Sequence, residues 1–290
     1  MADFRRITEL PTLPPRQPEG HKGTYGSVLI VAGSRGMAGA AALAGMSALR
    51  GGAGLVTVAC PEPIASLVSS FEPSYLTLPL PCDVEGRLLS QAAEILLARK
   101  FDVMAIGPGL GQSEELSTLV AKLVTTVEKP LIMDADGLNL LAPQLDLLKK
   151  RPSSTILTPH PGEFARLQGA SVSSSSADRE TAAFQFASRH RVVLILKGHG
   201  TVVTDGDKLA VNTTGNPGMA TGGTGDVLTG LLAALRGQSM SDFDAARLAV
   251  YLHGLAGDIV AADKGEISLI ARDLVEALPV AFLKHRSDRV

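Results

Sequence analysis

The stretch SVLIVAGSRGMAGAAALAGMSALR, residues 27–50, holds the pattern on which the predicted fold rests. Its first residues form a short, continuous apolar run that is typical of a buried β-strand, and a glycine-containing turn follows. From residue 38 to residue 50 the sequence is rich in alanine and glycine and predicts a helix. A short strand followed directly by a helix is the first unit of an alternating α/β arrangement.

The same alternation continues along the chain. Helical segments separate most of the strand-like runs, beginning with a short helix at 61–71. Short apolar strands that alternate with helices predict a parallel sheet covered by helices on both faces. The predicted fold is therefore α/β, a three-layer α/β/α sandwich with a mainly parallel central sheet. The further strands are expected within GLVTVAC (54–60), VMAIGPG (103–109), PLIMDAD (130–136), STILTPH (154–160) and VVLILKG (192–198).

The last third of the chain departs from this alternation. In GTVVTDGDKLAVN, residues 200–212, an Asp-Gly pair between two β-like runs predicts a β-hairpin late in the chain. Helices are expected after it, at 226–235, 242–262 and 270–285.

The first twenty residues contain four prolines and predict an extended arm rather than a helix. SVSSSSADRE, residues 171–180, is interpreted as a surface loop that leads into a helix beginning near Asp178. Strands of the same type lie on both sides of this loop. We therefore expect residues 1–290 to form one domain, with residues 1–20 as its arm.

Composition excludes several classes of protein. The formal net charge of -2 gives no basic surface for nucleic acid or an acidic membrane. Aromatic residues make up only 4% of the chain and tryptophan is absent, which argues against stacking platforms for single-stranded nucleic acid. The two cysteines have no metal-ligand spacing and form no disulfide framework. The beginning of the chain lacks the apolar core of a signal peptide, and no uninterrupted apolar run is long enough for a bilayer. We expect a cytoplasmic protein.

The glycine- and carboxylate-rich segments follow the predicted strands. In an open parallel sheet, ligands bind beyond the carboxyl ends of the strands, so these segments predict one shared site. The glycines after the first long strand have the spacing G-x-x-G-x-x-G, which disfavours the dinucleotide fingerprint of dehydrogenases, and a P-loop motif is missing. The segments are AGSRGMAGA, GPGLG, DADG, TPHPGE and KGHGT.

The stretch GNPGMATGGTGDVLTGLLAAL, residues 215–235, places Asp226 among glycines at the predicted start of a helix. Free N–H groups at such a helix end favour a bound anion. Asp226 either caps the helix or has a chemical role there. A carboxylate beside an anion-binding helix end is the arrangement expected for phosphoryl transfer to a hydroxyl, in which the carboxylate accepts the proton.

Four other side chains are candidates at this edge of the sheet. Of Asp134 and Asp136, we expect one to cap the following helix and the other to help hold a hydrated magnesium ion. His160 lies between two prolines that limit its orientation, which suggests a donor that orients the substrate. Lys197 either simply ends a buried strand or contacts a phosphate or nucleotide.

With these residues assembled, the chain resembles the ADP- or ATP-dependent NAD(P)H-hydrate dehydratases of the ribokinase-like superfamily. The resemblance runs from about His21 to the C-terminal helices, with the motifs in the family's order. G-T-G-D alone would indicate only the superfamily, whereas HKGTYG and TPHPGE make the resemblance specific. The matching pieces are HKGTYGSVLIVAGSRGMAGAAALAG, IGPGLG, DADGLNLL, LTPHPGEFARL, VVLILKGHGTVV and NTTGNPGMATGGTGDVLTG.

The resemblance implies an enzyme that repairs the S epimer of hydrated NADH or NADPH (NADHX or NADPHX). ADP or ATP, with Mg²⁺, phosphorylates the ring hydroxyl, and elimination of phosphate restores the coenzyme. The implied catalytic base is Asp226, which also contacts the substrate. The implied site residues, by role, are an anion hole of Gly223, Thr224 and Gly225; a nucleotide site of Lys197, Gly198, His199, Gly200, Thr201 and Gly225; and a substrate site of Ala40, Gly109, His160 and Asp226. The metal-binding residues are left unassigned.

The resemblance also implies partners and leaves alternatives. Some relatives carry a domain that epimerises the hydrate; we expect this chain to depend on a separate epimerase, and to form a homo-oligomer, a tetramer. A small-molecule kinase of the same superfamily, acting on a vitamin-precursor alcohol, would use the same aspartate and anion hole. A nucleotide-binding regulator without turnover is disfavoured by Asp226, since a pure anion sensor gains nothing from that carboxylate.

Overall fold

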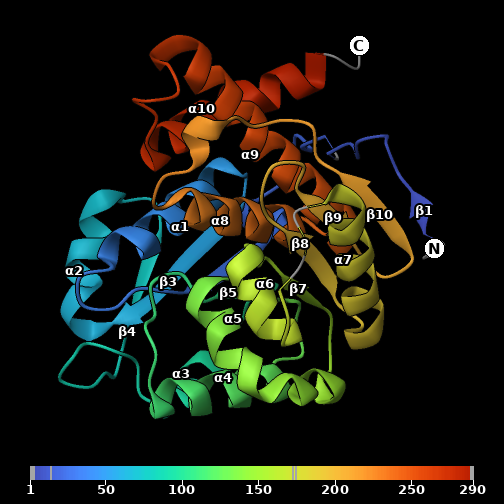
Figure 1. Ribbon diagram of the computed structural model, residues 1–290. Helices are drawn as coiled ribbons and strands as arrows, with labels where there is room; N and C mark the ends of the chain where they lie inside the picture. Colours follow the sequence, from blue (N-terminus) through green and yellow to red (C-terminus); the bar gives the residue numbers. More distant parts are fainter. Residues whose placement is uncertain (1–3, 14, 172, 174, 288–290) are drawn as a thin grey trace.

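One mixed sheet runs through the computed structural model, which describes residues 4–13, 15–171, 173 and 175–287 (Figure 1). The strand order in the described chain is β1-β10-β9-β8-β7-β6-β5-β2-β3-β4. Every pairing from β4 across to β8 is parallel, and β9 runs antiparallel to both β8 and β10. The strands are β1 Arg5–Arg6, β2 Ser27–Val31, β3 Leu55–Pro61, β4 Leu76–Leu80, β5 Val103–Ile106, β6 Leu131–Met133, β7 Thr155–Leu157, β8 Val193–Leu196, β9 Val202–Thr204 and β10 Lys208–Val211.

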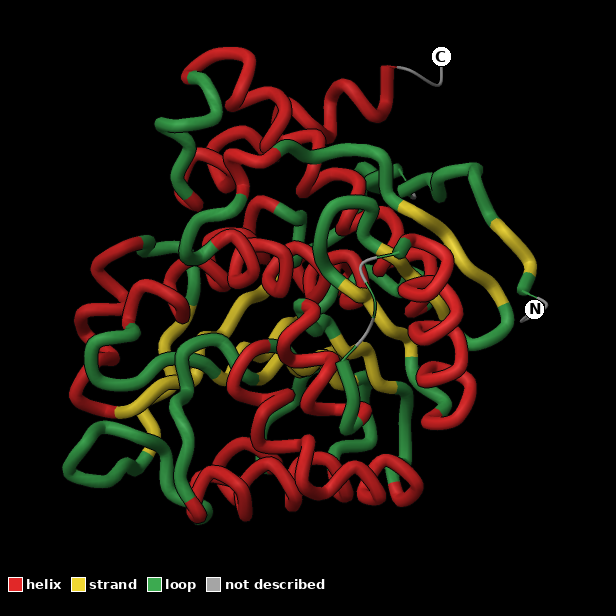
Figure 2. The backbone as a smooth tube through the Cα atoms, viewed as in Figure 1, coloured by secondary structure: helices red, strands yellow, loops and turns green. Residues whose placement is uncertain are grey.

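Helices cover both faces of the sheet, which is the sandwiched layer in Figure 2. Successive side chains of a strand point to opposite faces, so Val28 and Ile30 of β2 join one core while Leu29 and Val31 join the other. The first core includes α1, α2, α8, α9 and α10; the second includes α3 to α7. The α-helices are α1 Ala38–Arg50, α2 Glu62–Phe71, α3 Ala92–Leu97, α4 Glu114–Thr126, α5 Ala135–Leu141, α6 Pro161–Gln168, α7 Ser176–His190, α8 Thr224–Gly237, α9 Asp242–Lys264 and α10 Ala271–Ser287, with 3₁₀ helices at Lys22–Tyr25, Ala142–Lys150 and Pro217–Met219.

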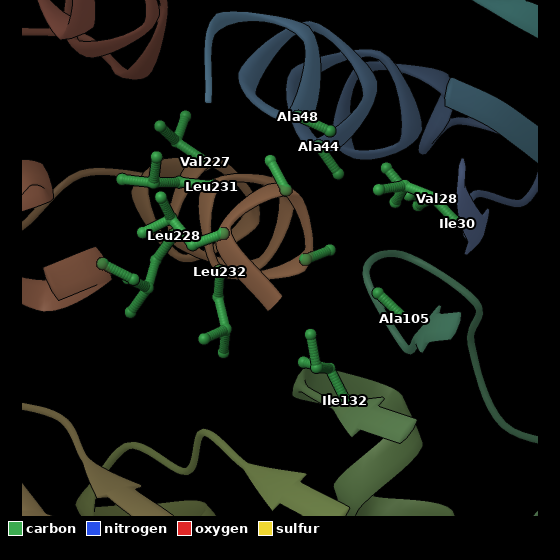
Figure 3. Close-up of a cluster of buried hydrophobic side chains, with 14 of the residues drawn as sticks. Val28, Ile30, Ala44, Ala48, Ala105, Ile132, Val227, Leu228, Leu231 and Leu232 are labelled. Carbon is green, nitrogen blue, oxygen red and sulfur yellow. The ribbon is translucent and has the colours of Figure 1, made fainter. Parts of the chain in front are cut away.

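Helices α1 and α8 pack in unusually close contact. A Cβ at Gly230 of α8 would lie 2.0 Å from the carbonyl oxygen of Ala44 in α1, so a larger residue cannot fit there. Figure 3 shows Ala44 and Ala48 of α1 above the leucines of α8, with the strand residues Val28 and Ile30 to the right and Ile132 below. The contacts run in the same direction along both helices, because Gly223 lies against Leu43 and Gly51 against Ala234. The two helices therefore begin side by side.

Two features differ from the predictions or extend them. The sequence analysis missed β4, whose Pro79 pairs with Cys60; β4 lies at the end of the sheet, where a missing N–H is tolerated. The described residues of the predicted extended arm contain no helix, and two of them form β1 beside β10. Of its four prolines, Pro14 lies outside the described residues.

Helix α9 bears on the prediction that no segment spans a membrane. Within the described residues it is the one helix whose length and apolar composition would suffice to cross a bilayer. However, 61% of its most apolar window is buried inside the protein, and its side chains belong to the first core. Core helices pass the same test of length and composition.

Candidate active site

Two glycines at the start of α8 differ in whether the packing of the protein requires them. Gly223 precedes the helix with φ 92°, and a Cβ there would lie 2.6 Å from Leu43, so packing demands glycine. Gly225 differs: its Cβ would stand 3.5 Å from Nζ of Lys197, which is ordinary contact. Glycine at position 225 therefore leaves room for something other than the protein. The helix predicted at 226–235 is confirmed, and it begins two residues earlier, at Thr224.

Asp226 lies in the first turn of α8, but it does not cap the helix. The residue at the N-cap position is Gly223, and the helix start has no hydrogen bond from a capping side chain. The capping alternative is therefore wrong in this structure. Burial, followed by the negative charge of Asp134, raises the pKa of Asp226 to about 7, against the opposing effect of Lys197.

A buried carboxylate lies beneath this helix start. Asp134 is 1% exposed and accepts hydrogen bonds from Nζ of Lys197 at 2.8 Å, from Thr158 at 2.7 Å and from Thr229 of α8 at 2.8 Å. Burial alone would raise its pKa, but the ammonium and the three donors outweigh burial and lower it. These three hydrogen bonds to Asp134 connect the ends of β6, β7 and β8 to α8.

The expectation that Asp134 or Asp136 caps α5 is wrong. Asp134 occupies the N-cap position, but its side chain makes no capping bond, since its oxygens are taken by the three donors above. Asp136 instead accepts a hydrogen bond from the amide of Gly111 at 2.8 Å, which links α5 to the GPGLG loop.

A cavity of about 460 Å³ lies between the KGHGT loop (residues 197–201), the start of α8 and residues 212–220. All six residues assigned to a nucleotide by resemblance line it: Lys197, Gly198, His199, Gly200, Thr201 and Gly225. From α9, His253 also lines the cavity and donates from Nε2 to the carbonyl of Thr224 at 2.8 Å. Burial lowers the pKa of His253 to about 4, so the imidazole is neutral at pH 7.

Two of the predicted substrate residues lie together, outside this cavity. A Cβ on Gly109 would be 3.0 Å from that of Ala40, in the first turn of α1. The hydroxyl of Ser34 donates to the carbonyl of Gly109 at 2.7 Å and holds this loop against the start of α1. Because α1 and α8 begin side by side, Ala40 and Gly109 belong to the same end of the molecule as Asp226.

His160 has a structural role that the sequence analysis did not assign. Its Nδ1 accepts hydrogen bonds from the amides of Gly162 and Glu163, and so caps α6. Its Nε2 lies 3.3 Å from a carboxylate oxygen of Glu163. Because Nδ1 accepts, the one N–H of the neutral ring is on Nε2 and faces Glu163, and the role of His160 as a donor to the substrate stays a prediction.

Glu163 and His253 are site residues that the sequence analysis missed. Glu163 is buried, accepts from the amide of His160 at 2.7 Å and lies 3.9 Å from Nζ of Lys197. In the sequence, a glutamate three residues after a cap is indistinguishable from an ordinary capping box. His253 lies mid-helix, far along the chain from Thr224, and gives no local signal.

Two solved structures share this architecture. A ribokinase-like superfamily protein from Enterococcus faecalis is 25% identical, with a TM-score of 0.78 over 97% of this chain and 96% of that one. The ADP/ATP-dependent NAD(P)H-hydrate dehydratase from Bacillus subtilis, co-crystallized with ATP and Mg²⁺, is 36% identical, with a TM-score of 0.81 over 94% of each chain. The fold is the ribokinase-like α/β/α sandwich, as predicted.

The family model described as NAD(P)H-hydrate dehydratase matches residues 28–280. The chain belongs to the NAD(P)H-hydrate dehydratase family. Among curated relatives, the bifunctional NAD(P)H-hydrate repair enzyme of Moorella thermoacetica is 44% identical over 270 residues, which are 92% of this chain and 51% of that protein. The chain spans about half the length of the curated relatives it matches.

Proposed function

We propose that this chain uses ADP or ATP to dehydrate the S epimer of NADHX and NADPHX, restoring NADH and NADPH. Family membership supports the substrate class. The observation that supports the chemistry is Asp226, a carboxylate with a pKa raised to about 7 that directly follows Gly225, a residue lining the 460 Å³ cavity. Ala40 and Gly109, at the neighbouring start of α1, provide the surface for the damaged coenzyme.

In this proposal Asp226 removes the proton from the ring hydroxyl while the hydroxyl oxygen attacks the terminal phosphorus of the nucleotide. The bond to the leaving nucleotide breaks, and the amides of Gly223, Thr224 and Gly225 stabilise the charge on the transferred group. The phosphate then leaves the ring with its C–O bond electrons, and loss of a proton from the adjacent carbon restores the double bond. Lys197 provides a positive charge on the nucleotide side.

The residues present are compatible with Mg²⁺ that is bound mainly through the nucleotide. Among the described residues, no group of three or more acidic, histidine or cysteine side chains is placed to hold a metal by itself. Mg²⁺ in phosphoryl-transfer sites typically keeps several waters and takes only one or two protein carboxylates. The oxygens of Asp134 already accept from three protein donors, so the phosphates of the nucleotide, rather than Asp134, would hold the ion. When bound, the ion would neutralise phosphate charge.

The proposal extends to the setting of the enzyme. We take residues 1–290 to act as one domain in the cytoplasm, to receive the S epimer with the help of an epimerase, and to assemble as a homotetramer without nucleic-acid or membrane partners. Exposed apolar side chains on α2 and β4 support contacts between copies: Leu67, Phe71 and Leu76. Light scattering that gives a monomer at micromolar concentration would contradict the tetramer.

Purified S and R epimers of NADHX test the function separately. Each is mixed with the protein, Mg²⁺ and either ADP or ATP, and the return of NADH absorbance is followed. We expect recovery from the S epimer only, with recovery from the R epimer after an epimerase is added. A stable phosphorylated product without NADH would instead favour the kinase alternative, and absence of any nucleotide-dependent change would refute the proposal.

A further inference from the structure

One arginine holds the backbone of the KGHGT loop. Arg179, near the beginning of α7, donates from Nη1 to the carbonyl oxygen of His199 at 2.6 Å. Its Nη2 lies 3.2 Å from the carbonyl oxygen of Lys197 and 3.4 Å from that of Leu196. A planar, rigid fork of donors suits such a set of acceptors better than a single ammonium does. Arg179 therefore connects α7 to the end of β8 and to the loop that follows.

These contacts determine where the amides of the loop point. The described chain contains no cis peptide bond, and in a planar trans peptide the N–H points opposite to the preceding carbonyl. Since the carbonyls of Lys197 and His199 face Arg179, the N–H groups of Gly198 and Gly200 point away from it. Within the described residues neither amide has a protein acceptor. Both glycines line the 460 Å³ cavity.

Unpaired backbone amides that face a cavity form a concave site for anions. Lys197 lines the same cavity and adds a positive charge. We propose that Arg179 is a positioning residue for nucleotide binding, which holds the KGHGT loop so that the amides of Gly198 and Gly200 face the phosphates. This inference rests on the proposed function, because it takes ADP or ATP as the ligand of the cavity.

The loop needs such a restraint because glycine loses more conformational freedom on ordering than any other residue. Without Arg179, a loop with two glycines would have to become ordered when the nucleotide binds, and that entropy cost would weaken binding. With Arg179, the loop is ordered beforehand. The charge of the guanidinium is a competing explanation, since it also lies on the nucleotide side of the molecule.

Two substitutions separate positioning from charge. Arg179→Met removes both the charge and the fork of donors, and Arg179→Lys keeps the charge but not the fork. Titration calorimetry with MgADP and MgATP should show about tenfold weaker binding for both variants, the scale of one charge-assisted hydrogen bond. The KM for NADHX should change less than about twofold. Arg189→Met is the matched control, since it removes an exposed arginine from the same helix and should bind nucleotide like wild type.

Three results with the Arg179 variants would overturn the inference. Full binding by Arg179→Lys would mean that charge acts, not positioning. Unchanged binding by Arg179→Met, or an equal loss for nucleotide and NADHX together with a lower melting temperature, would leave Arg179 a general structural residue. If the wild-type protein itself binds neither nucleotide, the proposed function fails and this inference with it; a loss confined to the Arg179 variants concerns Arg179 alone.

Discussion

Opposing electrostatic effects act on the carboxylate of Asp226. The helix end attracts negative charge, and the ammonium of Lys197 favours the ionised form. Burial and the negative charges of Asp134 and Asp136 act in the other direction and are stronger, because the pKa rises to about 7. A base with a pKa near the operating pH combines a useful ionised fraction with a strong pull on the proton.

Replacing Asp226 by asparagine should separate catalysis from structure. The amide keeps the size of the side chain but cannot accept the proton, so the rate of NADHX dehydration should fall by about 10²–10⁴. Nucleotide binding should be retained or become tighter, because a negative charge near the phosphates is lost. Rate measurements and calorimetry check the two effects. A variant that dehydrates NADHX at nearly the wild-type rate would refute the role of Asp226.

The same substitution should change how stability depends on pH. A carboxyl whose pKa is raised by folding contributes stability that is present below the unfolded value and lost as pH rises through about 7. An asparagine side chain does not titrate and shows no such loss. The Asp226→Asn variant should therefore gain in melting temperature relative to wild type as the pH is raised from about 4 to about 8, measured by scanning calorimetry. A constant difference would contradict the raised pKa.

The activity of the wild type should follow the ionisation of Asp226. Since the base works only when deprotonated, kcat/KM for NADHX should fall about tenfold per pH unit below a midpoint near pH 7. Stopped-flow or steady-state rates over the acid range check this. An acid limb centred near about 4, the value of an ordinary aspartate, would mean that Asp226 is not held in the environment described.

At the scale of elements, the first turn of α8 combines a helix start with a ligand site. Gly225→Ala should stabilise the protein by about 0.5–1 kcal/mol, because alanine is the better helix former. The methyl group added by Gly225→Ala would lie 3.5 Å from Nζ of Lys197, within the cavity that both residues line, and should weaken nucleotide binding. Urea unfolding and calorimetry test the two opposite effects. Unweakened binding would remove Gly225 from the nucleotide site.

Gly230→Ala, in the same helix, is the control with the opposite expectation. Its Cβ would lie 2.0 Å from the carbonyl oxygen of Ala44, so α1 and α8 would have to separate. Overpacking of this kind costs about 1–3 kcal/mol. Urea unfolding should show a lower stability, although Gly230 itself is not assigned to any ligand site.

The Asp134–Lys197 pair joins α5 to the end of β8, with side chains 2% and 20% exposed. Lys197→Met would leave a buried carboxylate without its counter-ion and should destabilise the protein by about 3–5 kcal/mol. Lys197→Met combined with Asp134→Asn should recover most of that loss, because no buried charge is left. Urea unfolding of the single and double variants measures the coupling; additive losses would contradict it.

The predicted strands and helices agree with the structure where a local sequence pattern, such as an apolar run or a turn pair, indicated them. Residues 27–50 form β2 and α1, the Asp205-Gly206 pair connects β9 to β10, and the helices of the last third are present. The pattern failed at β4, where Pro79 interrupts the strand-like sequence and β3 is the one strand, among those described, that pairs with it. The predicted capping role of Asp134 was also wrong. Capping is predicted from neighbouring residues, whereas the donors to Asp134 lie 24 to 95 positions away in the sequence.

At the scale of the whole molecule, the parallel sheet gathers the site from distant segments. The sequence predicted that the site lies at the carboxyl edge of the sheet. Ligands bind at the carboxyl ends of parallel strands, and the glycine segments follow those strands. It did not predict the partners of each side chain, such as Arg179 with the KGHGT loop or His253 with Thr224, because these depend on how α7 and α9 pack.

We propose that one site phosphorylates the hydrated coenzyme and then releases phosphate from it. To test this, the S epimer of NADHX is mixed with MgATP and the protein, and NADH, inorganic phosphate and ADP are measured in the same samples. The three products should appear in equal amounts at every time. ADP formed without NADH, with a phosphorylated nicotinamide product remaining, or NADH formed without consumption of nucleotide, would contradict it.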